Sequence, residues 1–141
     1  MMGGQVIDIE SEGMKISDDR LINLQRLKTG ALIECACVMG CMMAGADENA
    51  VGAAKLYAKN LGLAFQIKDD ILDIEGDQNI LGKPVGSDEN NQKSTFVSIF
   101  GMDKAKEMVK SLTNEAIRAA YTLNEPEFLI YLANVLVNRN K

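Results

Sequence analysis

Proline scarcity limits what this chain can fold into. Its 141 residues contain proline only at positions 84 and 126, so the long stretches between them lack the residue that most strongly breaks a helix. Apolar residues in these stretches recur at spacings of three and four, and Val, Ile and Thr do not cluster into alternating runs. The sequence therefore predicts an all-α fold.

Capping residues indicate where the first helices begin. Ser17 is a suitable N-cap, with Asp18 and Asp19 in the first turn, where the helix dipole favours negative charge. Gly30 is a point at which this helix either continues or divides into two. Asp47 is the expected cap of the next helix, which continues through a cluster of acidic residues.

A long polar segment follows that helix. The helical pattern stops at Gly76, and residues 76–93 hold three glycines, one proline and several Asn and Asp, which indicates a loop. A loop longer than about 12–15 residues in a compact domain is usually functional or disordered. Beyond it we expect a helix capped by Asp103 and running to about Leu123, and a last helix with Pro126 in its first turn. The chain is thus expected to form five or so helices.

Three aspartates lie within five positions of the helix before that loop. On a helix, Asp69 and Asp73 lie about 40° apart, and Asp70 flanks them. Like charges one turn apart repel by about 0.2–0.5 kcal/mol per pair, so a positive group is expected between them. A solvated acidic face is the simpler alternative, but such a face usually mixes Lys and Glu. A separate apolar stripe should face the core and consists of Ile67, Ile71 and Ile74.

Carboxylates without His or Cys suit a magnesium ion, which bridges protein oxygens to the phosphates of a substrate. Lysines could add phosphate contacts, although most lysines are simply solvated. Lys28 lies beside Thr29, and the long loop contains Lys83, Asp88 and Lys93. These residues favour a Mg²⁺-dependent diphosphate site on a helical bundle.

Charge and composition exclude several other classes. A net charge of −5 and a pI near 4.8 argue against nucleic acid or an anionic membrane as the main partner. The longest stretch without charge, 35–46, is short of the roughly 18 residues of a membrane span. The first dozen residues lack the features of a signal peptide, and three cysteines without histidine suit a reducing, cytoplasmic location.

The sulfur-containing residues of 35–43 are interpreted as core. Two of the three cysteines, Cys35 and Cys37, lie about 200° apart on a helix, so with no His a thiolate metal site is disfavoured against core packing. The methionines are interpreted as flexible core filler and are Met39, Met42 and Met43.

Five motifs in order resemble the trans-isoprenyl diphosphate synthases. FQIKDDILD at 65–73 is similar to the second aspartate-rich motif of that family, FQxxDDxxD. GGQVIDIESEG at 3–13 resembles its GGQ segment, and KTGALI at 28–33 its KTG motif. Residues 76–95 resemble the loop after the aspartates, and NRNK at 138–141 is similar to the basic ends of bacterial farnesyl diphosphate synthases.

The resemblance implies an all-α bundle of the isoprenoid synthase type, of which residues 1–141 would form the C-terminal half. About three Mg²⁺ ions would bridge two aspartate-rich motifs to an allylic diphosphate (dimethylallyl or geranyl), which ionises and is attacked by isopentenyl diphosphate to give farnesyl diphosphate. Pyrophosphate would be released, and the full-length enzyme would be a homodimer.

The resemblance also implies roles for individual residues. The metal ligands would be Asp69, Asp70 and Asp73. The catalytic residues would be Lys28, Thr29, Gln66 and Lys83. Substrate binding would involve Lys28, Gln66, Lys83, Lys93, Phe65, Arg139 and Lys141. Residues in a supporting position would be Asp88, Gln5 and Asp8.

Two departures from the family pattern matter. Gln92 precedes Lys93 where the family usually has glycine, which puts the local loop path in doubt. No first aspartate-rich motif with its following arginines precedes residue 28. We therefore expect the chain to be inactive alone. The alternative is a non-catalytic modulating subunit or structural fragment of the same fold.

Overall fold

The fold is all helical throughout the part of the chain that the structure describes, as the sequence predicts. A computed structural model describes residues 2–11, 13–14, 16–75 and 94–139. The helices are α1 (Met2–Glu10), α2 (Asp18–Gln25), the π-helix η1 (Arg26–Gly30), α3 (Ala31–Met43), α4 (Glu48–Glu75), α7 (Phe96–Phe100), α8 (Met102–Ala120) and α9 (Glu127–Asn138).

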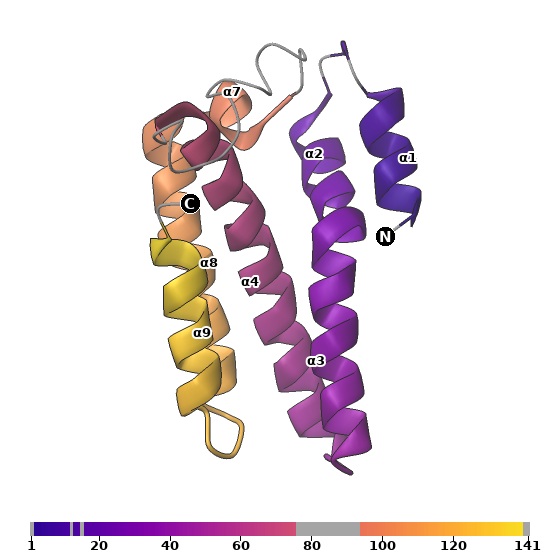
Figure 1. The fold of residues 1–141 in the computed structure, drawn as a ribbon, viewed down its shortest axis with the longest axis vertical. Helices are drawn as coiled ribbons and strands as arrows, with labels where there is room; N and C mark the ends of the chain where they lie inside the picture. Colours follow the sequence, from indigo (N-terminus) through magenta and orange to yellow (C-terminus); the bar gives the residue numbers. More distant parts are fainter. Residues whose placement is uncertain (1, 12, 15, 76–93, 140–141) are drawn as a thin grey trace.

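The 28-residue helix α4 is the centre of the bundle (Figure 1). The continuous rod formed by α2, η1 and α3 packs along one side of it, and α8 packs along the other. Helix α9 lies against α8, and α1 lies outside α2 and η1. None of the described helices is long and apolar enough to cross a membrane.

Two of the predicted helix caps are confirmed. The Ser17 hydroxyl accepts a hydrogen bond from the Arg20 backbone N–H at 3.4 Å, and an Asp47 carboxylate oxygen accepts one from the Ala50 N–H at 2.8 Å. Gly30 does not divide the helix, because the chain passes through it as one π-helical turn between α2 and α3.

The expected boundaries of α8 and α9 need correction. Gly101, with φ at 82°, is the N-cap of α8, so Asp103 lies inside the first turn instead of capping it. That left-handed conformation suits glycine, and it lets the chain turn sharply from α7 into α8. Helix α8 ends at Ala120, before Leu123, and Pro126 is the N-cap of α9. The predicted loop at 76–93 lies outside the described residues.

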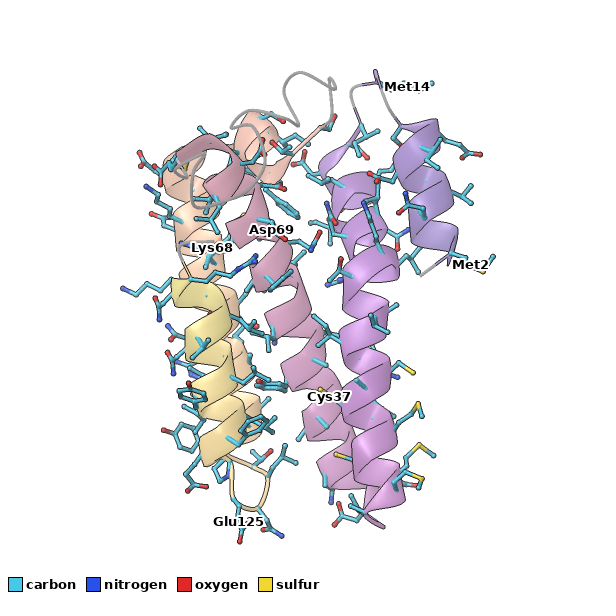
Figure 2. The ribbon with its side chains drawn as sticks, viewed as in Figure 1. Met2, Met14, Cys37, Lys68, Asp69 and Glu125 are labelled. Carbon is cyan, nitrogen blue, oxygen red and sulfur yellow. The ribbon has the colours of Figure 1, made fainter. Side chains whose placement is uncertain are left out.

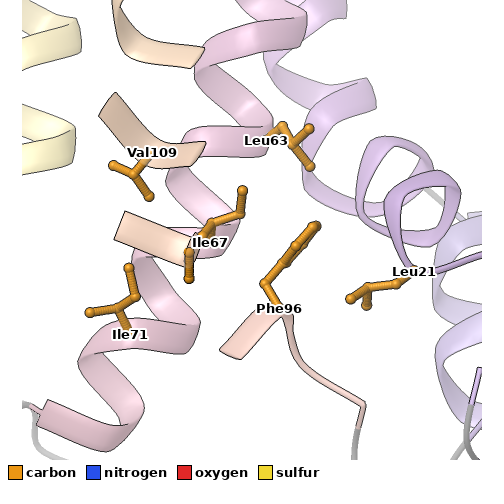
Figure 3. Packing of buried hydrophobic residues seen from close by; sticks show 7 residues of the cluster. Leu21, Leu63, Ile67, Ile71, Phe96 and Val109 are labelled. Atoms are coloured by element: carbon orange, nitrogen blue, oxygen red, sulfur yellow. The ribbon is translucent and has the colours of Figure 1, made fainter. Parts of the chain in front are cut away.

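Two hydrophobic clusters hold α4 to its neighbours. One lies toward its C-terminal end and joins α2, α4, α7 and α8 (Figure 3); its buried residues are Leu21, Leu63, Ile67, Ile71, Phe96, Ala105 and Val109. The other joins α4 to α8 and α9 through Tyr57, Leu61, Ala116, Ala119, Ala120 and Ala133. Two of the three stripe isoleucines are therefore in the core. Ile74 is not, because it lies in the last turn of α4 and is 46% exposed.

The interpretation of the sulfur-containing residues of 35–43 as core is wrong for four of the six. The three methionines are 57–87% exposed, and Cys35 is exposed, because α3 packs on α4 with one face only. Cys37 and Cys41 are half-buried, and Cys37 packs against the cluster around Tyr57. Burial raises the pKa of the Cys37 thiol, and Cys41 nearby raises it further.

Candidate functional site

A polar pocket of about 240 Å³ lies between α1, α2, η1 and α4. It is on the half of α4 away from the turn at Glu125, as the position of Asp69 in Figure 2 shows. The residues that line it are Asp8, Leu21, Leu24, Gln25, Lys28, Gln66, Asp69, Asp70, Ser94 and Thr95. The pocket thus joins four segments of the chain: α1, the stretch from α2 into η1, α4 and the two residues before α7.

The π-helical turn η1 carries Lys28 into this pocket. An extra residue in the turn changes the direction in which the following side chains project, and such turns are frequent at functional sites. The Lys28 ammonium lies 2.5 Å from a carboxylate oxygen of Asp8 on α1, and both side chains are partly buried. An ion pair therefore forms one wall of the pocket.

Two glycines allow the helices around Lys28 to come close. A Cβ added at Gly4 would lie 2.4 Å from the backbone nitrogen of Lys28, so only glycine fits there without a shift of the backbone. A Cβ added at Gly62 would lie 3.1 Å from the Cα of Gly30. These approaches set α1 and α4 directly against η1, and thereby fix the position of Lys28.

The three aspartates of α4 are in different environments. Asp70 is 7% exposed and accepts a hydrogen bond of 2.7 Å from the backbone N–H of Phe96, at the start of α7. Asp73 is 2% exposed and does not line the pocket. The Asp69 side chain is 43% exposed and pairs with Arg139. Asp69 and Asp70 therefore both line the pocket, while Asp73 is buried and is not part of its lining.

Arg139, just after α9, closes one side of the aspartate cluster. Its Nη2 lies 2.5 Å from an Asp69 carboxylate oxygen and donates to the Phe65 carbonyl oxygen at 3.3 Å. The guanidinium carbon lies 3.9 Å from the centre of the Phe65 ring, a cation–π contact. Arg139 thus links the C-terminal helix to two neighbouring turns of α4.

The pocket brings together five of the residues singled out in the sequence, namely Asp8, Lys28, Gln66, Asp69 and Asp70. Phe65 and Arg139 adjoin it through Asp69. Thr29 is half-buried and Gln5 is exposed, and neither lines the pocket. The remaining predictions lie outside the described residues and concern Lys83, Asp88, Lys93 and Lys141.

Sequence reasoning missed three polar residues that line the pocket. Gln25 lies one helical turn before Lys28, so helical spacing alone could have found it. Ser94 and Thr95 could have been noticed from a capping pattern: the Thr95 hydroxyl accepts from the Ser98 N–H, and the Ser98 hydroxyl accepts from the Thr95 N–H. That capping box begins α7 and thereby positions the Phe96 N–H, which donates a hydrogen bond to Asp70.

The donor set at this pocket fits a magnesium ion in part. Asp69 and Asp70 offer hard carboxylate oxygens on adjacent residues at one wall, and Mg²⁺ is commonly held by one or two carboxylates together with water and substrate phosphates. Among the described residues, no group of three or more His, Cys, Asp or Glu is arranged to hold a metal. A complete protein cage is therefore not formed by this part of the chain.

Comparison with known proteins gives consistent matches. A family model described as polyprenyl synthetase matches residues 1–127. The chain is 38% identical to a farnesyl diphosphate synthase of Escherichia coli over 146 residues, which cover all of this chain and 49% of that protein. It is 40% identical to a geranylgeranyl diphosphate synthase of Cyanophora paradoxa, covering 99% and 47%. The chain thus spans about half the length of the curated relatives it matches.

Solved structures give the same fold. An FPP/GFPP synthase from Zymomonas mobilis superposes with a TM-score of 0.82 at 32% identity, over 97% of this chain and 45% of that one. A geranyltransferase from Helicobacter pylori, determined in complex with magnesium and isoprenyl diphosphate, has a TM-score of 0.80 at 28% identity, over 98% and 46%.

Proposed function

Because this chain belongs to the polyprenyl synthetase family, we propose that it provides the diphosphate-binding part of a prenyltransferase. The reaction is the condensation of isopentenyl diphosphate with an allylic diphosphate, dimethylallyl or geranyl, to give farnesyl diphosphate and pyrophosphate. The relatives include both farnesyl and geranylgeranyl diphosphate synthases at similar identity. The farnesyl product is favoured by the similarity of residues 138–141 to the ends of bacterial farnesyl diphosphate synthases.

One observation supports this function above the others. Lys28, on η1, and the Asp69–Asp70 pair, on α4, line one polar pocket although about forty positions separate them in the sequence. A diphosphate binds best where a lysine contacts its oxygens on one side and carboxylate-held metal neutralises it on the other. An acidic pair opposite a lysine is the arrangement that such a ligand needs.

The proposed roles follow from this arrangement. Asp69 and Asp70 would hold Mg²⁺, which when bound neutralises charge on the leaving diphosphate. Lys28 leaves Asp8 to contact the same diphosphate, and Gln66 donates its side-chain amide at the reacting end. The further assignments rest on the resemblance: Asp73 as a third ligand, Thr29 and Lys83 as catalytic residues, Phe65, Lys93, Arg139 and Lys141 in substrate binding, and Asp88 and Gln5 in support.

The bond changes are those of an ionisation followed by an alkylation. The C–O bond between the allylic carbon and the diphosphate breaks, and the diphosphate leaves with the electron pair. The double bond of isopentenyl diphosphate attacks the allylic cation and forms the new C–C bond. The resulting tertiary cation loses a proton to a pyrophosphate oxygen, and a new double bond forms. Lys28 stabilises the negative charge that develops on the leaving group.

The wider assignments remain part of this proposal. They are about three Mg²⁺ ions per complete site, a homodimer when the protein has the length of its relatives, and a cytoplasmic location. Residues 1–141 would act as the C-terminal half of the synthase domain, with 76–93 as an active-site loop. The 141 residues contain one aspartate-rich motif of the two that the reaction requires, so the chain alone should not turn over substrate.

Calorimetric titration with pyrophosphate, with and without Mg²⁺, tests the site. We expect weak binding that requires Mg²⁺ and is reduced about tenfold or more by Lys28→Gln. Lys59→Gln, at an exposed position of α4, is the matched control and should bind as the unaltered chain does. Equal affinity with and without Mg²⁺ would contradict the metal bridge. An unchanged pyrophosphate affinity of Lys28→Gln would contradict a role of Lys28 in diphosphate binding.

Turnover separates the enzyme from the non-catalytic alternative. Labelled isopentenyl diphosphate and geranyl diphosphate are incubated with the 141-residue chain and with a version extended to the length of its relatives. The proposal expects farnesyl diphosphate from the extended protein only. Activity of the chain alone near the rate of the extended protein would refute the need for two motifs. Absence of activity in both would favour a modulating subunit.

A further inference from the structure

Arg139 forms an ion pair with Asp69, the most exposed of the three aspartates. Its Nη2 contacts the Asp69 carboxylate and the Phe65 carbonyl oxygen, and its guanidinium stacks on the Phe65 ring. The Arg139 side chain is only 19% exposed. A cation in direct contact with an Asp69 oxygen takes the position that a metal ion on the same oxygen would need.

We infer that Arg139 and a divalent cation exchange at Asp69, so that loading of the metal releases the arginine. This inference rests on the proposed function of the Asp69–Asp70 pair. A metal ion on that Asp69 carboxylate oxygen would lie within a few ångströms of the guanidinium, and the two positive charges would repel each other. In the metal-free chain Arg139, just after α9, neutralises Asp69, and a metal ion must compete with it for that carboxylate.

The contacts of Arg139 suit an exchange better than a permanent pairing. Its Nε is buried without a hydrogen-bond partner among the described residues, so the arrangement leaves part of the guanidinium unsatisfied. The stacking on Phe65 and the bond to the Phe65 carbonyl do not use Asp69. Arg139 can therefore remain beside the pocket after release, with N–H groups free to contact an anion there.

This exchange predicts that removing the arginine strengthens metal binding. Mn²⁺, a hard divalent cation that also prefers oxygen ligands, is titrated into the 141-residue chain without diphosphate, and free Mn²⁺ is measured by electron paramagnetic resonance. Arg139→Gln should bind Mn²⁺ about three- to tenfold more tightly than the unaltered chain, because a partly exposed ion pair with aromatic stacking is of modest strength.

Two further variants make the result specific. Arg118→Gln removes an exposed arginine from α8, lowers the positive charge by the same amount, and should leave Mn²⁺ affinity unchanged. Arg139→Lys keeps the charge but loses the planar guanidinium that stacks and forms two contacts at once, so its affinity should fall between the other two. This variant also serves if Arg139→Gln does not fold.

The direction of the change decides between exchange and a structural role. If Arg139 only stabilises the fold, its replacement leaves Mn²⁺ affinity unchanged or weakens it, and the inference is overturned. An increase in Arg118→Gln as large as that in Arg139→Gln also overturns it, because the effect is then one of net charge. If the unaltered chain and all variants fail to bind Mn²⁺, both the exchange and the proposed metal site are overturned. If the unaltered chain and its variants bind Mn²⁺ with equal affinity, the exchange is overturned but the proposed metal site is not.

Discussion

The two ends of α4 bury different kinds of side chain. Toward its N-terminal end, which we call the alanine end, Tyr57 and Leu61 pack against buried alanines of α8 and α9. Toward its C-terminal end, Ile67 and Ile71 alternate with the buried carboxylates of Asp70 and Asp73. Buried carboxylates destabilise a fold unless they have partners. One end of the helix is therefore built for close packing, and the other keeps groups that stability alone would not select.

The largest expected effect on stability comes from removing a buried carboxylate at the C-terminal end of α4. Asp70→Ala leaves the buried Phe96 N–H without its acceptor, so the free energy of unfolding should fall by about 2–3 kcal/mol. Asp70→Asn keeps an oxygen acceptor and should recover most of that loss while still weakening Mg²⁺-dependent pyrophosphate binding. Urea denaturation and calorimetry measure the two effects. Equal stability of both variants would show that the hydrogen bond to α7 does not hold this end together.

Overpacking the alanine end should affect stability only. Ala116 is fully buried, so Ala116→Leu must displace its neighbours and should lower the free energy of unfolding by about 1–3 kcal/mol. Ala36→Leu, at an exposed position of α3, is the matched control and should change it by less than about 0.5 kcal/mol. Pyrophosphate binding by folded Ala116→Leu should be unchanged. A change in that binding would mean that the two ends of α4 are coupled.

Tyr57 tests a buried polar contact of the alanine end. Its hydroxyl donates to the Leu129 carbonyl at 2.8 Å, so Tyr57→Phe should lower the free energy of unfolding by about 1–2 kcal/mol at neutral pH. Burial, and then the nearby Cys37, raise the pKa of Tyr57 to about 12 from 10.0. The folded state thus favours the neutral phenol.

The pH dependence of that contribution has a definite sign. Because the folded pKa is the higher one, the stabilisation is fully present below about pH 10 and is lost as the pH rises toward 12. Denaturation midpoints between pH 9 and about 11.5 should therefore decline more steeply in the unaltered chain than in Tyr57→Phe. Parallel declines would mean that Tyr57 does not titrate differently in the folded and unfolded states.

The sequence predicted the part of the site on α4 better than the segments that surround it. Helical spacing located α4, and carboxylate spacing located Asp69 and Asp70, since both depend on residues close together in the chain. The burial of Asp73 could not be anticipated from the sequence, because burial depends on which other segment of the chain covers a face of the helix. Helix α7 was not predicted, since its five residues carry too short a pattern.

Residues in the α1–α3 region show a second reason for failure. Met39, Met42 and Met43 lie on a helix with apolar residues on most sides, so periodicity cannot tell which side is covered. Helix α1 was not expected, because its glycines disfavour helix in isolation. Gly4 is accepted there because contact with the backbone of Lys28 leaves no room for a side chain, which is a tertiary cause.

The smallest expected effect concerns the exposed ion pair at the C-terminal end of α4. Lys106 lies 2.7 Å from Glu75, and both side chains are about half exposed. A double-mutant cycle with Lys106→Gln and Glu75→Gln should give a coupling of about 0.2–0.5 kcal/mol, which falls as salt is added. A coupling above about 1.5 kcal/mol would contradict the view that buried groups hold this end of α4, because a surface ion pair would then stabilise it as much as the buried Asp70 contact does. A small, salt-sensitive coupling leaves the Asp70–Phe96 bond and the isoleucine packing as the forces that hold α7 and α8 against the aspartate helix.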